Sequence, residues 1–430
     1  MGYYIITIGC YMNQADSERV ASFLEDNGCQ QTATWEIADI VILLTCGIRQ
    51  AAEDRAYGLV NQIVKRNPKA KIILSGCLAK RKDVKLRLGK QVSLFMSINE
   101  LPNLFKLLSK TKKVNLSDEE DLRKNKGDKY LSIIPKHESL FRAYVPIGNG
   151  CNNFCSYCVV PYARGREVYR SATDIIREVK DLIINRDYKE IVLIAQNVNS
   201  YQSGTIDFPK LLLKLIRIKG DFLIRFFSSH PKDLSDELIR VIASSDKMAN
   251  HLHIALQSGD DSILKAMNRK YTVKHFSRLI EKIRDARPGI AVTTDVIVGF
   301  PGETRAQFKK TLKIFKELTF EMAYISQYSR RPGTLAWSMD DNISLAEKKR
   351  RELELDCVLK TGALKVNQQY LNKELRVLVE RKDRQGHYHG RTSSFKDVKL
   401  LDATEVHLGK FAMVKIKAIK NFSLIGEIVK

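Results

Sequence analysis

The chain lacks any apolar run long enough to cross a membrane. Its 430 residues contain apolar runs of strand length, such as Ile191–Ala195, whereas a membrane-spanning helix needs about 20 consecutive apolar residues. Residues 1–10 also lack the basic stretch and long apolar core of a secretory signal peptide, and they are more typical of a strand. We therefore expect a cytoplasmic protein that has no membrane partner.

Acidic residues are scarce relative to basic ones. The chain has 49 Asp and Glu against 72 Lys and Arg, which gives a formal net charge of +23 at pH 7. Such a charge produces a strongly positive field, whose usual partner is a polyanion. We expect a nucleic acid partner, although the charge leaves DNA and RNA open and a plain solvated basic surface is the alternative.

Three of the eight cysteines stand in one C-x3-C-x2-C cluster, Cys151, Cys155 and Cys158. No nearby Cys or His offers a fourth ligand, which excludes a closed four-ligand zinc site. Three cysteines can instead hold a four-iron cluster whose fourth iron is open to another molecule. The spacing therefore predicts chemistry as well as structure, and Tyr157 is placed to lay its ring against a bound cofactor.

The first hundred residues alternate between strand-like and helix-like runs. Strands are expected at Tyr3–Ile8, Ile40–Leu44 and Ile72–Leu74, and helices at Gln14–Asn27, Ala51–Arg66 and Lys80–Leu88. This β-α-β-α pattern predicts an open parallel sheet flanked by helices.

One cysteine follows each of these three strands: Cys10, Cys46 and Cys77. Ligand sites in open α/β sheets gather outside the carboxyl ends of the strands. We therefore expect these thiols to converge on one metal centre, the alternative for each being a small buried apolar residue. Cys29 and Cys357 have no such partners and are interpreted as structural or incidental.

The remaining chain divides by composition. Residues 111–140 are polar and indicate a linker; we place the domains at residues 1–112, 137–367 and 368–430, with the linker at 113–136. Strands are expected at Tyr144–Ile147, Ile191–Ala195, Leu223–Phe227, Leu252–Leu256, Val292–Val298 and Met322–Tyr328. Six βα units predict a partial (β/α)6 barrel, whose functional face lies at the carboxyl ends of its strands. The C-x3-C-x2-C cluster follows the first of them.

A long charged helix, Ser344–Tyr370, leads to a C-terminal segment of a different kind. Its short strands, at Leu375–Glu380, Tyr388–Arg391, Lys396–Leu401, Phe411–Ile419 and Leu424–Val429, predict a small all-β barrel. The module is rich in Lys and Arg, and small β-barrels of this size often bind single-stranded nucleic acid. A plain structural barrel is the alternative.

Polar residues and glycines follow several barrel strands and suit a cofactor. Carboxamides and hydroxyls can bind a ribose or an amino group, an arginine can bind a carboxylate, and glycine allows close backbone approach. Loop or N-cap roles are the alternative for each. The expected contacts are Gln196, Asn197, Gln257, Ser258, Arg269, Val298 and Gly299.

The cysteine loop after a first barrel strand resembles that of the radical S-adenosylmethionine superfamily. The resemblance implies that S-adenosylmethionine binds the open iron of a [4Fe-4S] cluster held by Cys151, Cys155 and Cys158. One electron then cleaves the sulfonium, and the 5′-deoxyadenosyl radical abstracts hydrogen from an unactivated carbon, while the protein positions and shields it.

The whole chain resembles the methylthiotransferase family, which joins such a barrel to an N-terminal α/β domain and a C-terminal TRAM domain that binds RNA. The resemblance implies a second [4Fe-4S] cluster on Cys10, Cys46 and Cys77. One S-adenosylmethionine would methylate sulfur held there, and another would yield the radical.

Four segments look most like the MiaB branch, which methylthiolates C2 of N6-isopentenyladenosine at position 37 of tRNA. They are Gln196–Tyr201, Ser228–Pro231, Leu256–Gly259 and Tyr328–Thr334. The ending Ala163-Arg-Gly-Arg166 is similar to the branch that acts on N6-threonylcarbamoyladenosine, which is the alternative. A ribosomal-protein substrate fits less well, and a non-catalytic, metal-stabilised RNA-binding protein fits least.

The resemblance implies a tRNA anticodon stem-loop and an external electron donor as partners, and we expect a monomer. One departure stands beside Cys46, where Leu44 and Gly47 replace the Asn and Ser that the family often has. The cysteine ligand is kept, so we expect cluster binding to survive this change.

Overall fold

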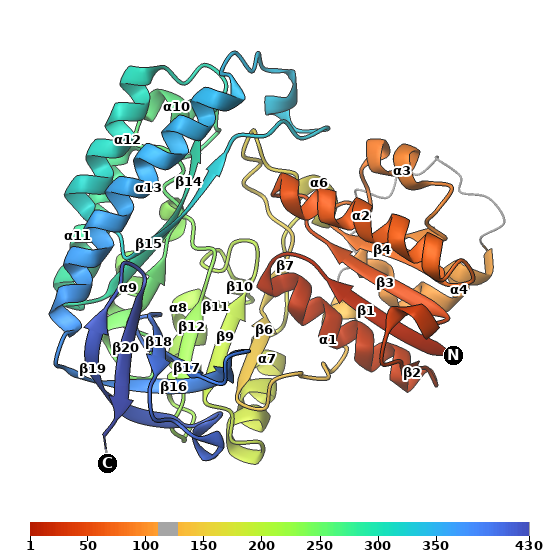
Figure 1. Ribbon diagram of the computed structural model, residues 1–430, viewed down its shortest axis with the longest axis horizontal. Coiled ribbons are helices and arrows are strands. Elements are labelled where there is room, and N and C mark those ends of the chain that lie inside the picture. Colours follow the sequence, from red (N-terminus) through yellow and green to blue (C-terminus); the bar gives the residue numbers. More distant parts are fainter. Residues whose placement is uncertain (111–127, 430) are drawn as a thin grey trace.

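The computed structural model describes residues 1–110 and 128–429 in three parts: an N-terminal part, a central part and a C-terminal barrel drawn in blue (Figure 1). The expected linker falls outside the described residues up to residue 127 and then continues through the short helix α5 (Asp128–Leu131). None of the helices within these two ranges is long and apolar enough to cross a membrane.

Five parallel strands form the N-terminal sheet, in the order β2-β1-β3-β4-β5. The elements are β1 (Gly2–Thr7), α1 (Tyr11–Asp26), β2 (Gln30–Gln31), β3 (Ile40–Thr45), α2 (Gln50–Arg66), β4 (Lys71–Gly76), α3 (Lys82–Leu88), β5 (Leu94–Phe95) and α4 (Leu104–Lys110). Strand β3 is buried throughout because alternate residues pack on opposite faces: Ile42 joins the core beneath α1, and Leu43 the core beneath α2. The expected open parallel α/β fold is confirmed.

The central part contains six parallel strands in chain order. They are β6 (Arg142–Pro146), β9 (Glu190–Ile194), β12 (Leu223–Phe226), β13 (His251–His253), β14 (Ala291–Val298) and β15 (Met322–Gln327). The first three pair with one another, as do the last three, and a parallel bridge between Ser229 and Ile254 joins the two halves. This arrangement confirms the predicted partial (β/α)6 barrel.

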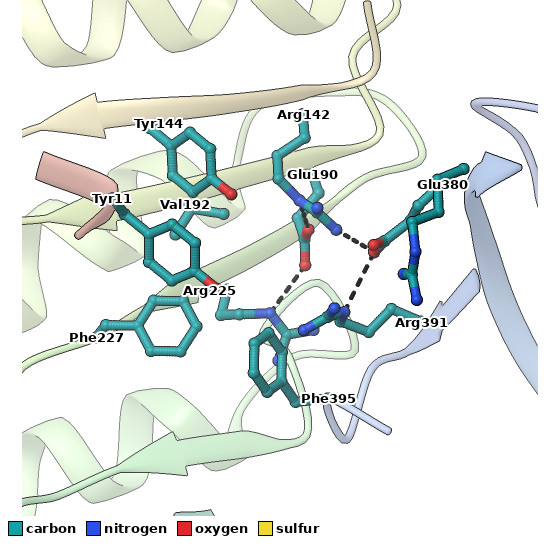
Figure 2. A pocket seen from close by; sticks show the side chains of 11 residues that line it. Tyr11, Arg142, Tyr144, Glu190, Val192, Arg225, Phe227, Glu380, Arg391 and Phe395 are labelled. Carbon is teal, nitrogen blue, oxygen red and sulfur yellow. Dashed lines mark hydrogen bonds and ion pairs between the residues drawn. The ribbon is translucent and has the colours of Figure 1, made fainter. Parts of the chain in front are cut away.

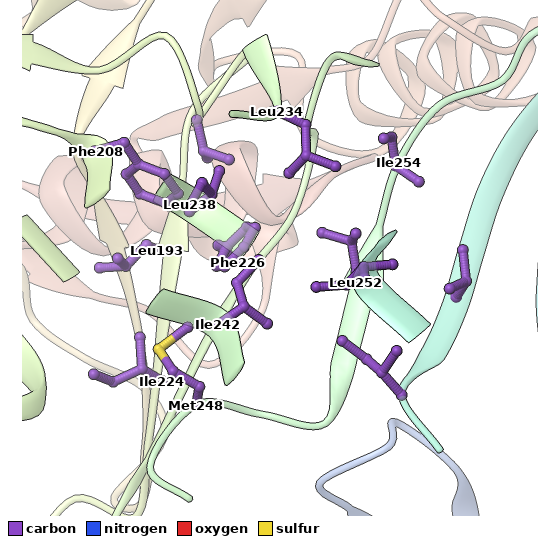
Figure 3. Close-up of a cluster of buried hydrophobic side chains, with 14 of the residues drawn as sticks. Leu193, Phe208, Ile224, Phe226, Leu234, Leu238, Ile242, Met248, Leu252 and Ile254 are labelled. Carbon is purple, nitrogen blue, oxygen red and sulfur yellow. The ribbon is translucent and has the colours of Figure 1, made fainter. Parts of the chain in front are cut away.

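Helices cover the outside of this arc (Figure 1). They are α7 (Ala172–Lys180), α8 (Phe208–Ile216), α9 (Asp236–Ala243), α10 (Asp261–Ala266), α11 (Val273–Ala286), α12 (Arg305–Leu318) and α13 (Leu345–Asn367). Apolar residues on the outer faces of the strands, such as Leu193 and Ile224, pack against helix residues such as Phe208 and Leu238 (Figure 3). The alternate strand positions, including Arg225, face inward, so polar groups line the interior of the barrel.

The C-terminal part is a closed five-stranded barrel, β16-β17-β18-β20-β19. Its strands are β16 (Glu374–Lys382), β17 (Tyr388–Thr392), β18 (Asp397–Leu400), β19 (Phe411–Ile419) and β20 (Ser423–Ile428). The turn after β17 lies against the first strands of the central barrel, where Arg225 donates to the backbone carbonyls of Thr392 and Ser393 at 3.3 and 3.1 Å. The predicted all-β barrel is confirmed, and it covers the amino ends of the central strands.

Candidate functional site

Three neighbouring parallel strands bring the loops of Cys10, Cys46 and Cys77 together at their carboxyl ends. Gly9, at φ +118°, packs so closely that a Cβ there would lie 2.5 Å from the Cβ of Cys46. A Cβ on Gly47 would lie 3.3 Å from the Cβ of Cys77. Within residues 1–110 and 128–429, no three Cys, His, Asp or Glu side chains stand in metal-coordinating geometry, so the loops hold these thiols near one another without preset coordination.

These thiols are shielded from water and affect one another's charge. Burial, followed by the charge of Cys77, raises the pKa of Cys46 to about 11. Cys10 stays accessible to solvent, yet surrounding protein desolvates it enough to raise the pKa of its thiol as well. Because a bound metal stabilises the thiolate form, three clustered thiols of this kind fit an iron–sulfur cluster.

The C-x3-C-x2-C loop follows β6 and the short strand β7 (Gly148–Asn149) at the carboxyl end of the barrel. A turn before it requires glycine, because Gly150 has φ +87° and a Cβ there would meet the carbonyl oxygen of Arg166 at 2.1 Å. Arg269 Nη1 lies 3.4 Å from Cys155 Sγ, and Asn153 Nδ2 lies 3.5 Å from Cys151 Sγ. The loop therefore presents its sulfurs beside hydrogen-bond donors, which suits a negatively charged cluster.

The two cysteine groups lie on either side of the interface between the N-terminal part and the barrel. Arg164, which follows Cys158 in the barrel, bonds Asn13 and Asp16 of α1, the helix that follows Cys10. Burial and then the charge of Cys155 raise the pKa of Cys158. The structure thus brings together two groups that stand 74 or more residues apart in the chain.

Arg164 joins the two groups. It lies in α6 (Val160–Arg164), where only 3% of the residue is exposed. Its guanidinium donates to Asn13 Oδ1 at 2.8 Å, to Asp16 Oδ2 at 2.7 Å and to Asn149 Oδ1 at 3.0 Å. The charges of Asp16, Cys77 and Cys10 raise the pKa of Arg164 despite its burial, so a permanent cation sits between the two cysteine loops.

Two expected cofactor contacts are also held by the protein itself. Gln196 Oε1 accepts a hydrogen bond from the backbone N–H of Gly150 at 2.6 Å, so it braces the turn before Cys151. Asn197 donates to Asp233 Oδ2 at 2.8 Å.

Tyr157 is half-buried, and burial raises the pKa of its hydroxyl. The side chain of Val298 lies in the hydrophobic core, and its backbone carbonyl accepts a hydrogen bond from the N–H of Tyr328 at 2.9 Å.

Around the fourth and fifth strands, one expected residue has a buried polar atom without a partner in the described part of the chain. Gln257 has φ +67°, and its buried Oε1 has no hydrogen-bond partner within the part of the chain that the structure describes. Ser258 is buried beside it. Gly299, at φ +69°, packs against the stem of Lys348, where a Cβ would lie 2.4 Å from Cγ.

Sequence reasoning missed Arg164 because its partners stand 148 and 151 residues away and form no local motif.

Comparisons with known proteins cover the whole chain. Family models match residues 145–315 (radical SAM superfamily), residues 2–97 (uncharacterized protein family UPF0004) and residues 368–429 (TRAM domain). A tRNA-2-methylthio-N(6)-dimethylallyladenosine synthase of Thermoanaerobacter pseudethanolicus is 40% identical over 438 residues, covering 100% of this chain and 93% of its own. The protein of the same name from Dictyoglomus thermophilum is 39% identical over 439 residues, covering 100% and 98%.

Solved structures share the fold at low identity. The radical S-adenosylmethionine methyltransferase TsrM from Kitasatospora setae, bound to tryptophan and a SAM analogue, matches with a TM-score of 0.57 and 13% identity over 78% of this chain and 75% of that one. The cobalamin-dependent radical enzyme OxsB matches with a TM-score of 0.53 and 12% identity over 82% and 56%. These likenesses support the barrel architecture alone.

Relatives near 40% identity along nearly their whole length establish the family, and the three matched models account for its three parts. Such enzymes use S-adenosylmethionine and two [4Fe-4S] clusters, so these are the cofactors of this chain. The chain belongs to the radical S-adenosylmethionine methylthiotransferase family.

Proposed function

We propose that the protein adds a methylthio group to C2 of N6-dimethylallyladenosine at position 37 of tRNA. The observation that carries the proposal is full-length identity of about 40% to several enzymes named for this product. The closeness of the two cysteine groups supports it, because sulfur from one centre and a radical from the other must meet at one carbon atom.

The proposed cluster ligands are the two cysteine groups. Cys151, Cys155 and Cys158 would hold one cluster, and Cys10, Cys46 and Cys77 the other. When bound, the clusters and S-adenosylmethionine supply one-electron reduction, hydrogen abstraction and the transferred sulfur.

The chain's own residues position these groups. Gln196 holds the backbone of Gly150 before the first loop, and Arg269 donates toward Cys155. Arg164 bonds both α1, which begins next to Cys10, and Asn149, which precedes Gly150. It therefore fixes the position of one cysteine loop relative to the other.

The RNA contacts follow from charge and chemistry. The C-terminal barrel matches the TRAM model, and the chain carries a net charge of +23, so binding should weaken steeply as salt rises. Position 37 lies in the anticodon loop, where the target base must leave its stack to reach an enclosed site. We further propose an external electron donor, a monomeric enzyme and a cytoplasmic location, where its tRNA substrate is found.

Mass spectrometry of tRNA nucleosides from a deletion strain tests the substrate. We expect the methylthio group to disappear from N6-dimethylallyladenosine, which keeps its N6 substituent, and to return with the wild-type gene. Loss of methylthiolated threonylcarbamoyladenosine instead would assign the protein to the other branch, and unchanged nucleosides would reject both.

Iron content tests the ligands. Anaerobic reconstitution should give about eight irons per chain, and about four after Cys10, Cys46 and Cys77 are replaced together by Ala. The matched control replaces Cys29 and Cys357, which should leave about eight. Full iron content in the triple variant would reject the second cluster site.

A further inference from the structure

A cavity of about 260 Å³ lies where the N-terminal part, the central barrel and the C-terminal barrel meet (Figure 2). Tyr11 comes from α1, Tyr144 and Phe227 from the region of β6 and β12, and Phe395 from the turn after β17. The volume is close to the lower limit of about 300 Å³ for small-molecule sites. Such a space suits one nucleobase and its substituent and excludes an RNA stem.

One side of the cavity is aromatic, as Figure 2 shows. Tyr11 stacks on Tyr144 with ring centroids 4.8 Å apart, and Phe227 lies 5.2 Å from both Tyr11 and Phe395. Rings that meet at mixed angles around an open space offer faces and edges to a planar group and to an alkenyl chain. This wall suits an adenine that carries an apolar N6 substituent.

The side of the cavity opposite the aromatic rings is lined by charged side chains, and more of them are positive than negative. Arg142, Arg225, Arg381 and Arg391 face the cavity with only two carboxylates, Glu190 and Glu380, which leaves a formal excess of two positive charges. Arg225 donates to Glu190 at 2.8 Å, and Arg142 bonds both carboxylates.

Arg391 Nε lies 3.4 Å from Glu380 without forming a hydrogen bond to any described residue. Guanidinium donors beside carboxylate acceptors can bind the polar edge of a base or the phosphate next to it.

Phe395 is the aromatic residue that the C-terminal barrel contributes to the wall of the cavity, and its backbone is strained. Its φ is +64°, a left-handed conformation that a bulky residue rarely adopts. The side chain is half-buried, stacked on His251 at 4.9 Å and covered by Arg391 at 4.2 Å. A strained aromatic residue aimed into a cavity and fixed by its neighbours indicates a functional constraint.

The cavity also begins beside a proposed cluster ligand, since Tyr11 directly follows Cys10. We propose that this cavity receives the target nucleoside and that the C-terminal barrel, through Phe395 and Arg391, reads its N6 substituent. The proposal rests on the proposed function. It makes the C-terminal barrel, which closes the amino end of the central barrel's interior, a specificity element there as well as an RNA-binding surface outside it.

Binding of two synthetic anticodon stem-loops to the reconstituted holoenzyme tests this assignment. The two RNAs differ only in carrying N6-dimethylallyladenosine or adenosine at position 37. We expect the wild type to prefer the modified RNA. Phe395→Gly, which suits the backbone at φ +64°, should lower affinity for the modified RNA by about 10- to 150-fold, since burying an apolar group of this size is worth about 1.5–3 kcal/mol. Affinity for the unmodified RNA should change less than about twofold.

Two further variants make the result specific. Phe411→Ala removes a ring of the same barrel that lies under Arg376 at 3.6 Å and outside the cavity, so it should keep the preference. Phe395→Leu keeps much of the apolar contact and should keep more of the preference than Phe395→Gly.

A Phe395→Gly variant that keeps the wild-type preference would overturn the assignment while leaving the proposed function intact. A wild-type enzyme that neither prefers nor modifies the dimethylallyl RNA would overturn the proposed function itself.

Discussion

Replacing Arg164 by Met should loosen the N-terminal part from the barrel. Arg164 and Asp16 are 3% and 0% exposed, and their charges meet at 2.7 Å. Met keeps most of the side-chain length but leaves the Asp16 carboxylate buried without its cation. Removing one partner of such a pair costs about 3–5 kcal/mol. The interface between the N-terminal part and the barrel is what this change destabilises, because Asp16 belongs to the first and Arg164 to the second.

Hydrogen exchange followed by mass spectrometry measures this loss in the apoprotein. Amides of α1 that are protected by docking should exchange at least about 100-fold faster in the variant, since each 1.4 kcal/mol corresponds to a factor of ten. Amides of α11, on the far side of the barrel, serve as the internal control.

A double variant decides whether charge is the cause. Arg164→Met with Asp16→Asn removes both charges and should regain much of the lost protection, because an uncharged pair leaves no buried ion. If the single variant exchanges like the wild type, or if the double variant is no better than the single one, the reasoning about this ion pair is refuted.

Three further predictions concern stability. Burial alone would raise the pKa of Glu190, but two arginines outweigh it and lower this pKa from 4.5 to about 2. The wild type should therefore lose stability to urea as the pH falls from about 4.5 toward 2, and Glu190→Gln should flatten this dependence. Burial lowers the pKa of Lys396 from 10.5 to about 8, so Lys396→Met should raise the free energy of unfolding at pH 7 by about 3 kcal/mol, a gain that should vanish above pH 10.5. A variant less stable than the wild type would show instead that the amine is well paired. Gly299→Ala should lower stability by more than the roughly 1–2 kcal/mol that a left-handed backbone costs an alanine, because its Cβ would meet Lys348. Gly302→Ala, which has a similar φ and open space around it, should lower stability by the backbone amount alone, and equal thermal midpoints for the two variants would contradict this.

Local sequence patterns predicted most elements of the fold. The expected strand Phe411–Ile419 is β19 as observed, and the expected helix Ala51–Arg66 differs from α2 by one residue. Such segments are strongly periodic, and burial of one face fixes their conformation. The edge strands β2 and β5 have two residues each, so they carry no periodicity and were not predicted. The expected strand Leu252–Leu256 ends at His253, beyond which the chain bends to give Gln257 its positive φ.

The site was predictable only as far as its residues form local patterns. Cys151, Cys155 and Cys158 lie within one loop, and each strand-end cysteine follows a recognisable strand. Gln196 was expected to touch a cofactor, and the structure adds that its amide oxygen holds Gly150. No spacing rule could supply that contact, because the two residues are 46 positions apart and meet through the parallel pairing of β6 with β9.

The sequence by itself determined the three-part architecture and the two cysteine groups, because periodicity, strand-end position and ligand spacing are local properties of the chain. Its resemblance to known enzymes indicated the family. Only the tertiary structure decided that Arg164 links the two groups and that Phe395 enters a chamber walled by all three parts. Their partners are brought together by domain packing, where burial removes water and makes each charge and each ring depend on its new neighbours.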